Sequence, residues 1–128
     1  MSSQRTPGDD LIGYLTRYPE EIAFGADAPE DVLDRYHTPD YHVVNDGVRL
    51  DRQRLLDHVR PARKRASAVR VTVHDALVDG ERVAARYRLD AVMRTGRTII
   101  TEVYMFGLLA PDGRLRRAEQ LTRTLPDA

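Results

Sequence analysis

The stretch RVAARYRLDAVMRTGRTIITEVYMFGLL, residues 82–109, is the most informative part of this sequence. Apolar and polar residues alternate on both sides of RTGR, a pattern typical of two strands joined by a hairpin turn. The alternation continues in VRVTVHDAL (69–77) and RLRRAEQLTRTL (114–125), and the segments VDGE and APDG between these runs have turn composition. The sequence therefore predicts four antiparallel strands in chain order.

The residues before these strands show helical periodicity. The segments DDLIGYLTRYPEEIAFG (9–25), APEDVLDRYH (28–37) and DRQRLLDHVRPARKRA (51–66) each place apolar residues on one face. Pro19 and Pro61 should bend the first and third of these helices. TPDYHVVNDG (38–47) should run extended into a turn. Helices followed by a meander indicate the α+β class, with the N-terminal helices packed on one face of a curved antiparallel sheet.

Length and composition suit a single domain over residues 1–128, with residues 1–8 expected to be flexible. No apolar run approaches the roughly 18 residues of a membrane span, so we expect no membrane partner. The opening MSSQRTPGDD lacks the features of a secretory or transit signal, so we expect a cytoplasmic protein. The absence of cysteine excludes disulfides, thiolate metal ligands and a cysteine nucleophile.

The charges are balanced overall but divided between the two halves of the chain. Residues 1–57 hold 6 arginines against 12 acidic residues, whereas residues 58–128 hold 14 basic residues against 8 acidic ones. Two halves of opposite net charge favour packing of one half against the other, or self-association of the chain. Nucleic-acid binding would instead need a net basic domain. We therefore expect no nucleic-acid partner.

The turn at Thr95 and Gly96 sets the predicted register of the central strands. If these two residues form the loop, Tyr87 pairs with Tyr104, Ala85 with Phe106, and Leu89 with Glu102. Glu102 then lies on the apolar, helix-facing side of the sheet together with Tyr87, Tyr104 and Phe106, which are candidates for substrate binding. The opposite side carries the charged residues Arg82, Arg86, Arg88 and Asp90.

The last strand can bring a second carboxylate to the same side. Pairing Leu108 with Leu115 sets Glu119 opposite Tyr104, although a bulge at the Gly113 turn would reverse this. A carboxylate covered by helices has a raised pKa, which suits proton transfer, and tyrosine hydroxyls can stabilise an enolate oxygen. Equally, arginines of the last strand can pair with both glutamates in a purely structural network.

Several other side chains are candidates for the same site. His58, on the third helix, is a third acid–base candidate, with a solvent-exposed position as the alternative. Tyr14, Tyr41 and Asn45 are candidates for substrate binding, with core packing or ordinary turn chemistry as the alternatives. His37 and His42 bracket a Thr-Pro-Asp turn without the spacing of a metal site, so we predict no metal ligands and expect both histidines to face solvent.

Three segments, YHTPDYHVVNDG (36–47), DALVDGERVAARYRL (75–89) and PDGRLRR (111–117), resemble the SnoaL-like branch of the nuclear transport factor two-like superfamily. The resemblance covers about residues 28–125. It implies a cone-shaped α+β barrel with a deep apolar pocket, and a homodimer formed through the convex sheet face, where Arg82, Arg86 and Arg88 would lie.

The resemblance also implies a class of activity. Members include polyketide cyclases and steroid isomerases, which move protons within the pocket without a metal or organic cofactor. We therefore expect a cofactor-independent cyclase, isomerase or dehydratase acting on an apolar carbonyl metabolite. The alternative is a non-catalytic ligand-binding or accessory dimerisation domain. SnoaL-type cyclases carry an aspartate on the late strands, where the nearest groups here are Glu102 and Glu119.

Overall fold

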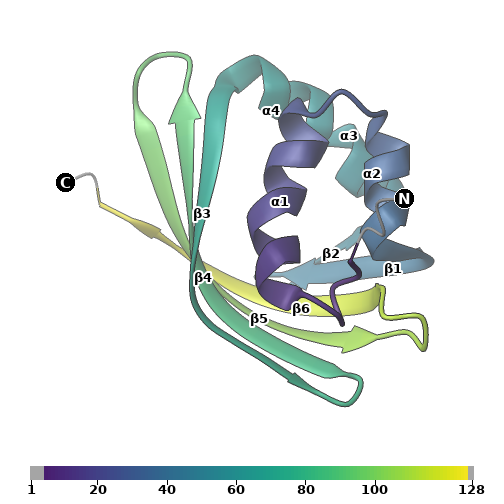
Figure 1. The fold of residues 1–128 in the computed structure, drawn as a ribbon. Helices are drawn as coiled ribbons and strands as arrows, with labels where there is room; N and C mark the ends of the chain where they lie inside the picture. The colour runs from purple at the N-terminus through teal and green to yellow at the C-terminus, as the bar shows by residue number, and fades with distance from the viewer. Residues whose placement is uncertain (1–4, 127–128) are drawn as a thin grey trace.

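The computed structural model describes residues 5–126, as four helices and six strands (Figure 1). The elements are α1 (Leu11–Phe24), α2 (Pro29–Tyr36), β1 (His37–Asn45), β2 (Val48–Asp51), α3 (Arg52–Asp57), α4 (Val59–Arg65), β3 (Ala66–Asp79), β4 (Arg82–Met93), β5 (Thr98–Leu109) and β6 (Leu115–Leu125). Helices come first and the long strands follow, so the predicted α+β class is confirmed. No helix in this part of the chain is long and apolar enough to cross a membrane.

Side-chain caps fix where the helices begin. Asp10 Oδ1 accepts a hydrogen bond from the Gly13 amide at 2.9 Å, and Asp51 Oδ1 accepts one from the Arg54 amide at 2.9 Å. The predicted third helix is divided into α3 and α4 at His58. Pro61 has no N–H to donate to the carbonyl four residues earlier, at Asp57, which explains why α3 ends there.

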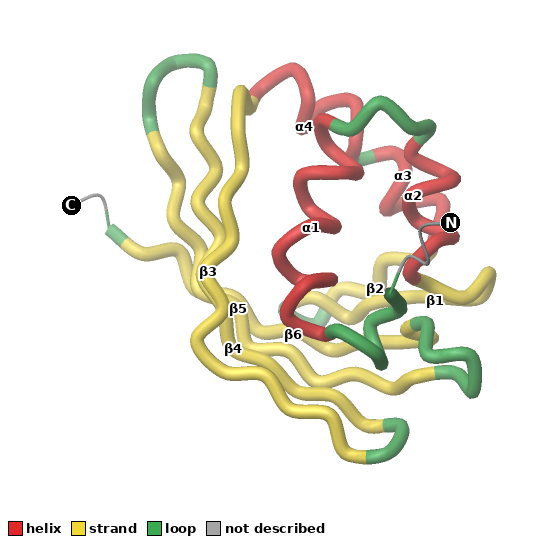
Figure 2. Tube along the Cα trace, in the orientation of Figure 1, coloured by secondary structure: helices red, strands yellow, loops and turns green. Residues whose placement is uncertain are grey.

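The strands form one curved, mixed sheet in the order β2-β1-β6-β5-β4-β3. The predicted meander of β3 to β6 is antiparallel throughout, whereas β1 lies parallel to β6. The helices lie on the concave side of this sheet (Figure 2). We call the helix-covered side the inner face and the opposite side the outer face.

The predicted register of β4 and β5 is wrong by one residue. The hairpin has a three-residue loop, in which the Met93 amide donates to Arg97 O at 2.7 Å and the Gly96 amide donates to Met93 O at 2.9 Å. Gly96 adopts a φ of 93°, the left-handed conformation that this loop type requires and glycine tolerates. Tyr87 is therefore opposite Val103, and Arg88 is opposite Glu102. This shift exchanges the two faces of β5 relative to the prediction.

The β5–β6 pair contains the bulge that the sequence left open. Leu109 pairs with Leu115, but Leu108 pairs with Arg117, so one extra residue of β6 is accommodated there. Leu115 is buried on the inner face, and Glu119 lies on the outer face opposite Phe106.

The core lies between the helices and the inner face. It is made from the buried residues Leu11, Tyr14, Leu15, Val32, Tyr36, Tyr41, Val43, Val83, Ala85, Tyr87, Val103, Met105, Leu109, Leu115 and Ala118. Of the segment predicted to be flexible, residues 1–4 lie outside the described residues. Within the remainder, Pro7 is buried and the Gly8 amide donates to Gly113 O at 3.0 Å.

Candidate functional site

An aromatic cluster fills the centre of the space between the helices and the inner face. It consists of Tyr14, Tyr18, Tyr36, His37, Tyr41 and Tyr87, which we call the inner aromatic cluster. The ring centroids of His37 and Tyr41 are 4.2 Å apart, and those of Tyr18 and His37 are 4.8 Å apart. Tyr14 and Tyr18 stack at 5.5 Å because a spacing of four residues places them on one face of α1.

His37 is fully enclosed and hydrogen-bonded at both ring nitrogens. Nδ1 lies 2.8 Å from Leu33 O, which can only accept, so Nδ1 carries the proton. Nε2 then accepts from the Tyr14 hydroxyl at 2.7 Å. Burial lowers the pKa of His37 to about 4, so the ring is neutral at physiological pH.

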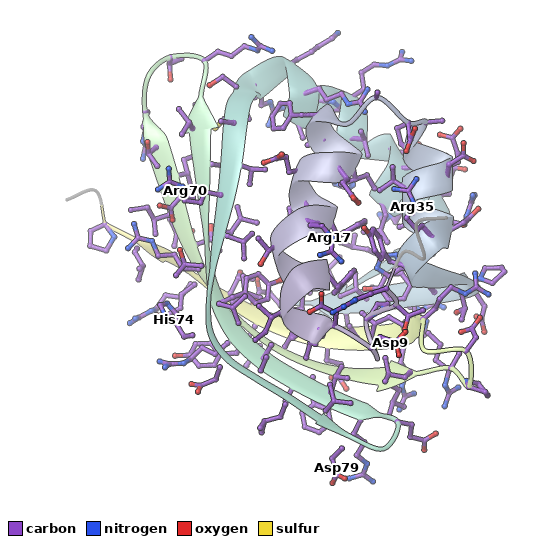
Figure 3. All side chains as sticks on the ribbon, viewed as in Figure 1. Asp9, Arg17, Arg35, Arg70, His74 and Asp79 are labelled. Atoms are coloured by element: carbon purple, nitrogen blue, oxygen red, sulfur yellow. The ribbon has the colours of Figure 1, made fainter. Side chains whose placement is uncertain are left out.

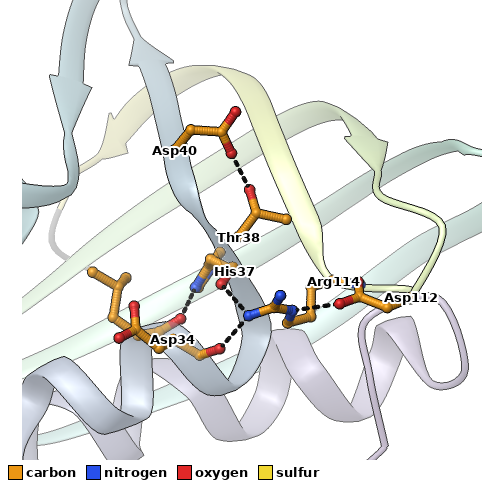
Figure 4. Close-up of polar contacts among 7 residues, drawn as sticks. Asp34, His37, Thr38, Asp40, Asp112 and Arg114 are labelled. Carbon is orange, nitrogen blue, oxygen red and sulfur yellow. Dashed lines mark hydrogen bonds and ion pairs between the residues drawn. The ribbon is translucent and has the colours of Figure 1, made fainter.

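The backbone around His37 is fixed by an arginine from the turn before β6. Arg114 Nη1 donates to the carbonyl oxygens of Asp34 at 3.1 Å and His37 at 3.3 Å, and Asp112 holds the guanidinium through Nε at 2.8 Å (Figure 4). This contact joins the end of α2 to the start of β6, the strand that neighbours β1. The position of the His37 ring is therefore set from two directions.

Not every tyrosine hydroxyl of the cluster finds a hydrogen-bond acceptor in the protein. Burial, followed by the proximity of Tyr18 and Tyr87, raises the pKa of Tyr41, and burial raises that of Tyr87 to about 12. Burial likewise raises the pKa of Tyr18, so all three phenols stay protonated. Within residues 5–126, the hydroxyls of Tyr18 and Tyr41 have no hydrogen-bond partner. Tyr87 accepts only a long bond, 3.5 Å, from Gln120 Nε2.

One amide side chain, that of Gln120, lies beside a phenol of the cluster, and a second shares its face of the sheet. Gln120 of β6 pairs with Met105 of β5 on the inner face. Asn45, at the end of β1, is in register with Gln120 and therefore shares its face of the sheet. The predicted candidates Tyr14, Tyr41 and Tyr87 thus belong to the cluster, and Asn45 lies on the same side of the sheet.

The structure places four other predicted site residues on the outer face. Glu102, Tyr104, Phe106 and Glu119 lie there because of the three-residue loop and the β6 bulge. Glu102 accepts from Arg123 Nη2 at 3.0 Å and from the Tyr104 hydroxyl at 3.3 Å. The structural ion-pair alternative therefore describes Glu102 correctly, and the prediction that the two glutamates lie beneath the helices is wrong.

The third acid–base candidate also lies away from the inner aromatic cluster. His58 is exposed between α3 and α4, with its Nδ1 against the Arg54 carbonyl oxygen. The solvent-exposed position that was the alternative for His58 is confirmed.

Sequence reasoning missed Tyr18, His37 and Gln120 as members of the site. The spacing of Tyr14 and Tyr18 was a usable signal for the first. For His37 the sequence favoured exposure, because a histidine before a Thr-Pro-Asp turn is usually solvated. Only the packing of α2 against the sheet shows that it is buried.

The most prominent cavity lies on the outer face instead. It has a volume of about 760 Å³ and includes Leu77, Ala84, Arg86, Tyr104, Phe106 and Leu121 in its lining. We call it the outer groove. The inner aromatic cluster contributes no residue to the lining of the outer groove or of three smaller cavities on the described residues.

The arrangement of helices on a curved mixed sheet is the nuclear transport factor two-like fold, also described as ketosteroid isomerase-like. Within that fold, the chain belongs to the SnoaL-like domain family, whose sequence profile matches residues 15–118. A search among curated proteins finds no match.

Solved structures support the fold. IdmH, a proposed polyketide cyclase from Streptomyces antibioticus, has 19% identity and a TM-score of 0.67, with 91% of each chain covered. A proposed SnoaL-like polyketide cyclase from Jannaschia sp. CCS1 has 17% identity and a TM-score of 0.66, covering 94% of this chain and 91% of that one. A hypothetical protein with a ketosteroid isomerase-like fold from Catenulispora acidiphila DSM 44928, in complex with trimethylamine, has 11% identity and a TM-score of 0.64, covering 91% of this chain and 85% of that one. At these identities the likeness concerns the fold alone.

Proposed function

We propose that this chain is a small-molecule binding protein whose ligand contacts the inner tyrosine hydroxyls, in space that opens when the side chains of the cluster move apart. The observation that carries the proposal is a pair of hydroxyls on the inner side, those of Tyr18 and Tyr41, that donate to no acceptor within residues 5–126. A hydroxyl that donates to no protein group is available to donate to a ligand oxygen, and such a hydrogen bond stabilises the complex. The ligand class is therefore a molecule with at least one carbonyl or ether oxygen.

The surroundings of the hydroxyls favour an uncharged, largely apolar ligand. Among residues 5–126, the only buried polar or charged residues are His37 and Thr38. The His37 ring is neutral, and the charged groups beside Tyr36, Glu21 and Arg35, already pair with each other at 3.5 Å. A charged ligand would therefore bear a large cost of desolvation. The aromatic rings of the cluster match a flat, apolar molecule instead.

Binding without chemistry is favoured over the cyclase, isomerase or dehydratase activity that the relatives suggest. Glu102 and Glu119 lie on the outer face, so they do not face a ligand at the inner aromatic cluster. The bases in contact with the cluster are His37 and Glu21, which accepts from the Tyr36 hydroxyl at 2.9 Å. Burial lowers the pKa of His37 and opposes formation of a buried imidazolium during proton abstraction. Glu21 is held by the Tyr36 hydroxyl and by Arg35, whose Nη1 lies 3.5 Å from Oε1.

The test compares two probes that differ by one oxygen. The first, 1-tetralone, is a neutral bicyclic ketone, and the second, tetralin, is the matching hydrocarbon. We expect 1-tetralone to raise the melting temperature more than tetralin does, because only the ketone can accept from the phenols. The double variant Tyr18→Phe/Tyr41→Phe should abolish that difference. The matched control is Tyr104→Phe, the same chemical change on the outer face.

Two outcomes contradict the proposal. Equal stabilisation by ketone and hydrocarbon would show that the hydroxyls do not select an acceptor oxygen. Conversion of the ketone to a new compound, followed by mass spectrometry and lost in the double variant, would place the chain among the enzymes.

A further inference from the structure

Basic side chains gather at one end of the molecule. Residues 60–65 of α4, RPARKR, include four basic residues and no acidic one, and the loop 94–97 between β4 and β5 adds Arg94. The Arg94 amide donates to Arg65 O at 2.8 Å, and Arg94 Nη2 donates to Arg63 O at 3.2 Å, so the two segments are held together. Both lie at the same end of the fold (Figure 1), where side chains tipped with nitrogen project outward (Figure 3). We call this set the basic end: Arg60, Arg63, Lys64, Arg65 and Arg94.

The positive charges of the basic end are not neutralised within residues 5–126. None of its five members forms a salt bridge there. Arg63 Nη2 donates to Ile22 O at 3.2 Å, and Arg94 donates to Arg63 O, so both bind neutral carbonyl oxygens. Arg86 and Arg123, by contrast, pair with carboxylates at 3.1 Å and 3.0 Å. The basic end is therefore a local excess of positive charge on a chain whose net charge is zero.

Stabilisation of the helix end does not account for all of these side chains. Cations near a helix C-terminus complement the dipole and bind the last carbonyl oxygens. At the end of α4 these oxygens already have donors. The Ala66 amide donates to Ala62 O, and Arg94 donates to the carbonyl oxygens of Arg63 and Arg65. Capping of α4 therefore needs Arg94 alone among the basic side chains.

Arg60 and Lys64 repel each other instead of stabilising α4. They are four residues apart, so they share one face of the helix, and both are exposed. Like charges at this spacing destabilise a helix. A negatively charged partner that contacts both side chains would relieve the repulsion.

The surroundings of the basic end distinguish between kinds of anionic partner. Among the described residues, no exposed large apolar side chain comes from α3, α4 or the loop 94–97, so this end has no apolar anchor for a membrane surface. Residues 59–67 and 93–98 include no aromatic ring on which a nucleic-acid base could stack, and a net charge of zero opposes nucleic-acid binding. Carboxylates suit the site, because guanidinium groups bind them with two parallel hydrogen bonds.

We propose that the basic end is a docking site for an acidic segment of a protein partner. Carboxylates of that segment bind the exposed side chains of Arg60, Lys64 and Arg65. Arg94 keeps α4 and the β4–β5 loop together as one surface. This proposal does not depend on ligand binding at the inner aromatic cluster.

The experiment measures the fluorescence anisotropy of a dye-labelled peptide of alternating glutamate and serine, titrated with the full chain. At about 50 mM salt the peptide should bind with a Kd below about 1 mM. The matched peptide of alternating glutamine and serine should bind at least about tenfold more weakly, because it lacks the carboxylates. Raising the salt to about 200 mM should weaken binding of the glutamate peptide, since the charges are exposed and screened.

Two double variants locate the binding surface. Arg60→Gln/Lys64→Gln should weaken binding of the glutamate peptide by at least about tenfold. The control Arg116→Gln/Arg117→Gln removes the same charge from two exposed arginines of β6 and should change the affinity by less than about twofold. Circular dichroism should show that both variants are folded. If the first is unfolded, Arg65→Gln decides, with an expected loss of about threefold.

Three outcomes would overturn the proposal. The first is no binding of the glutamate peptide at protein concentrations up to about 1 mM. The second is equal weakening by the two double variants, which would show that binding follows net charge and not this surface. The third is tighter binding, in the same buffer, to vesicles of phosphatidylcholine and phosphatidylserine or to a short DNA duplex, which would assign the basic end to a membrane or to nucleic acid.

Discussion

Glu102 of β5 and Arg123 of β6 lie directly opposite each other, and Arg123 Nη2 donates to Glu102 Oε1 at 3.0 Å. The pair sits on the outer face, where the Arg123 side chain is 70% exposed and the Glu102 side chain 17%. A carboxylate that the sequence suggested as an acid–base group is therefore one half of an ion pair on the side of the sheet away from the helices.

The first prediction concerns Glu102→Gln. Exposed ion pairs contribute little, so the free energy of unfolding should fall by less than about 1 kcal/mol. The ketone-dependent thermal shift should be unchanged, because Glu102 does not face the inner aromatic cluster. Urea unfolding and thermal shift measure the two quantities. If Glu102→Gln kept its stability but lost the thermal shift caused by 1-tetralone, Glu102 would have to take part in ligand binding.

The second prediction contrasts three tyrosines that differ in their hydrogen bonds. Tyr14→Phe removes the donor to His37 Nε2 and should destabilise the fold by about 1–3 kcal/mol, because a buried acceptor is left unsatisfied. Tyr18→Phe and Tyr41→Phe remove hydroxyls without partners within residues 5–126, so they should be neutral or stabilising. Chemical denaturation of the three variants compares them directly. A cost for Tyr41→Phe as large as that for Tyr14→Phe would show that its hydroxyl is bonded.

The third prediction is a loss of stability in mild acid. The folded protein holds the pKa of His37 at about 4, below its ordinary value of 6.5, so between these values the unfolded chain binds more protons. Stability should be complete above pH 6.5 and should fall by about 3 kcal/mol on descending towards pH 4.

The variant His37→Gln tests the assignment of this acid sensitivity. Glutamine keeps a polar side chain but does not titrate, so unfolding free energies measured from pH 7 to pH 4 should lose most of their slope. A slope equal to that of the wild type would assign the acid sensitivity to other groups.

The fourth prediction concerns the loop that sets the register of β5. Gly96→Ala forces a side chain into the left-handed region and should cost about 1 kcal/mol. Open space surrounds this position, so the cost would come from the backbone and not from a clash. Thr95→Ala in the same loop is the control and should be nearly neutral. Equal stabilities of the two variants would argue against the three-residue loop.

The sequence was sufficient for the class of fold because its hydrophobic period changes once, from helical to alternating. It was insufficient for the register, because TIITEVYMFGLL is apolar on both of its faces. Val103 and Met105 suit the core no better than Tyr104 and Phe106 would. Only the loop geometry at Gly96 therefore distinguishes the observed register from the predicted one. The alternation rule works best where one face is polar, and β5 lacks such a face.

The inner aromatic cluster was predictable only in part. Tyr14, Tyr41 and Tyr87 follow from local periodicity, since each lies on the apolar side of its own element. His37 joins them because β1 pairs in parallel with β6, a contact between segments more than seventy residues apart. Local patterns carry no information about such pairing, so the burial of His37 and its bond to Tyr14 required the folded structure.

The inner aromatic cluster also gives the protein a built-in optical reporter. The chain has six tyrosines and no tryptophan, and every tyrosine except Tyr104 belongs to that cluster. The tyrosine fluorescence and near-ultraviolet circular dichroism of the protein therefore originate almost entirely from this cluster. Ligand binding at the cluster, or loosening of its packing, should change these signals in the unlabelled protein.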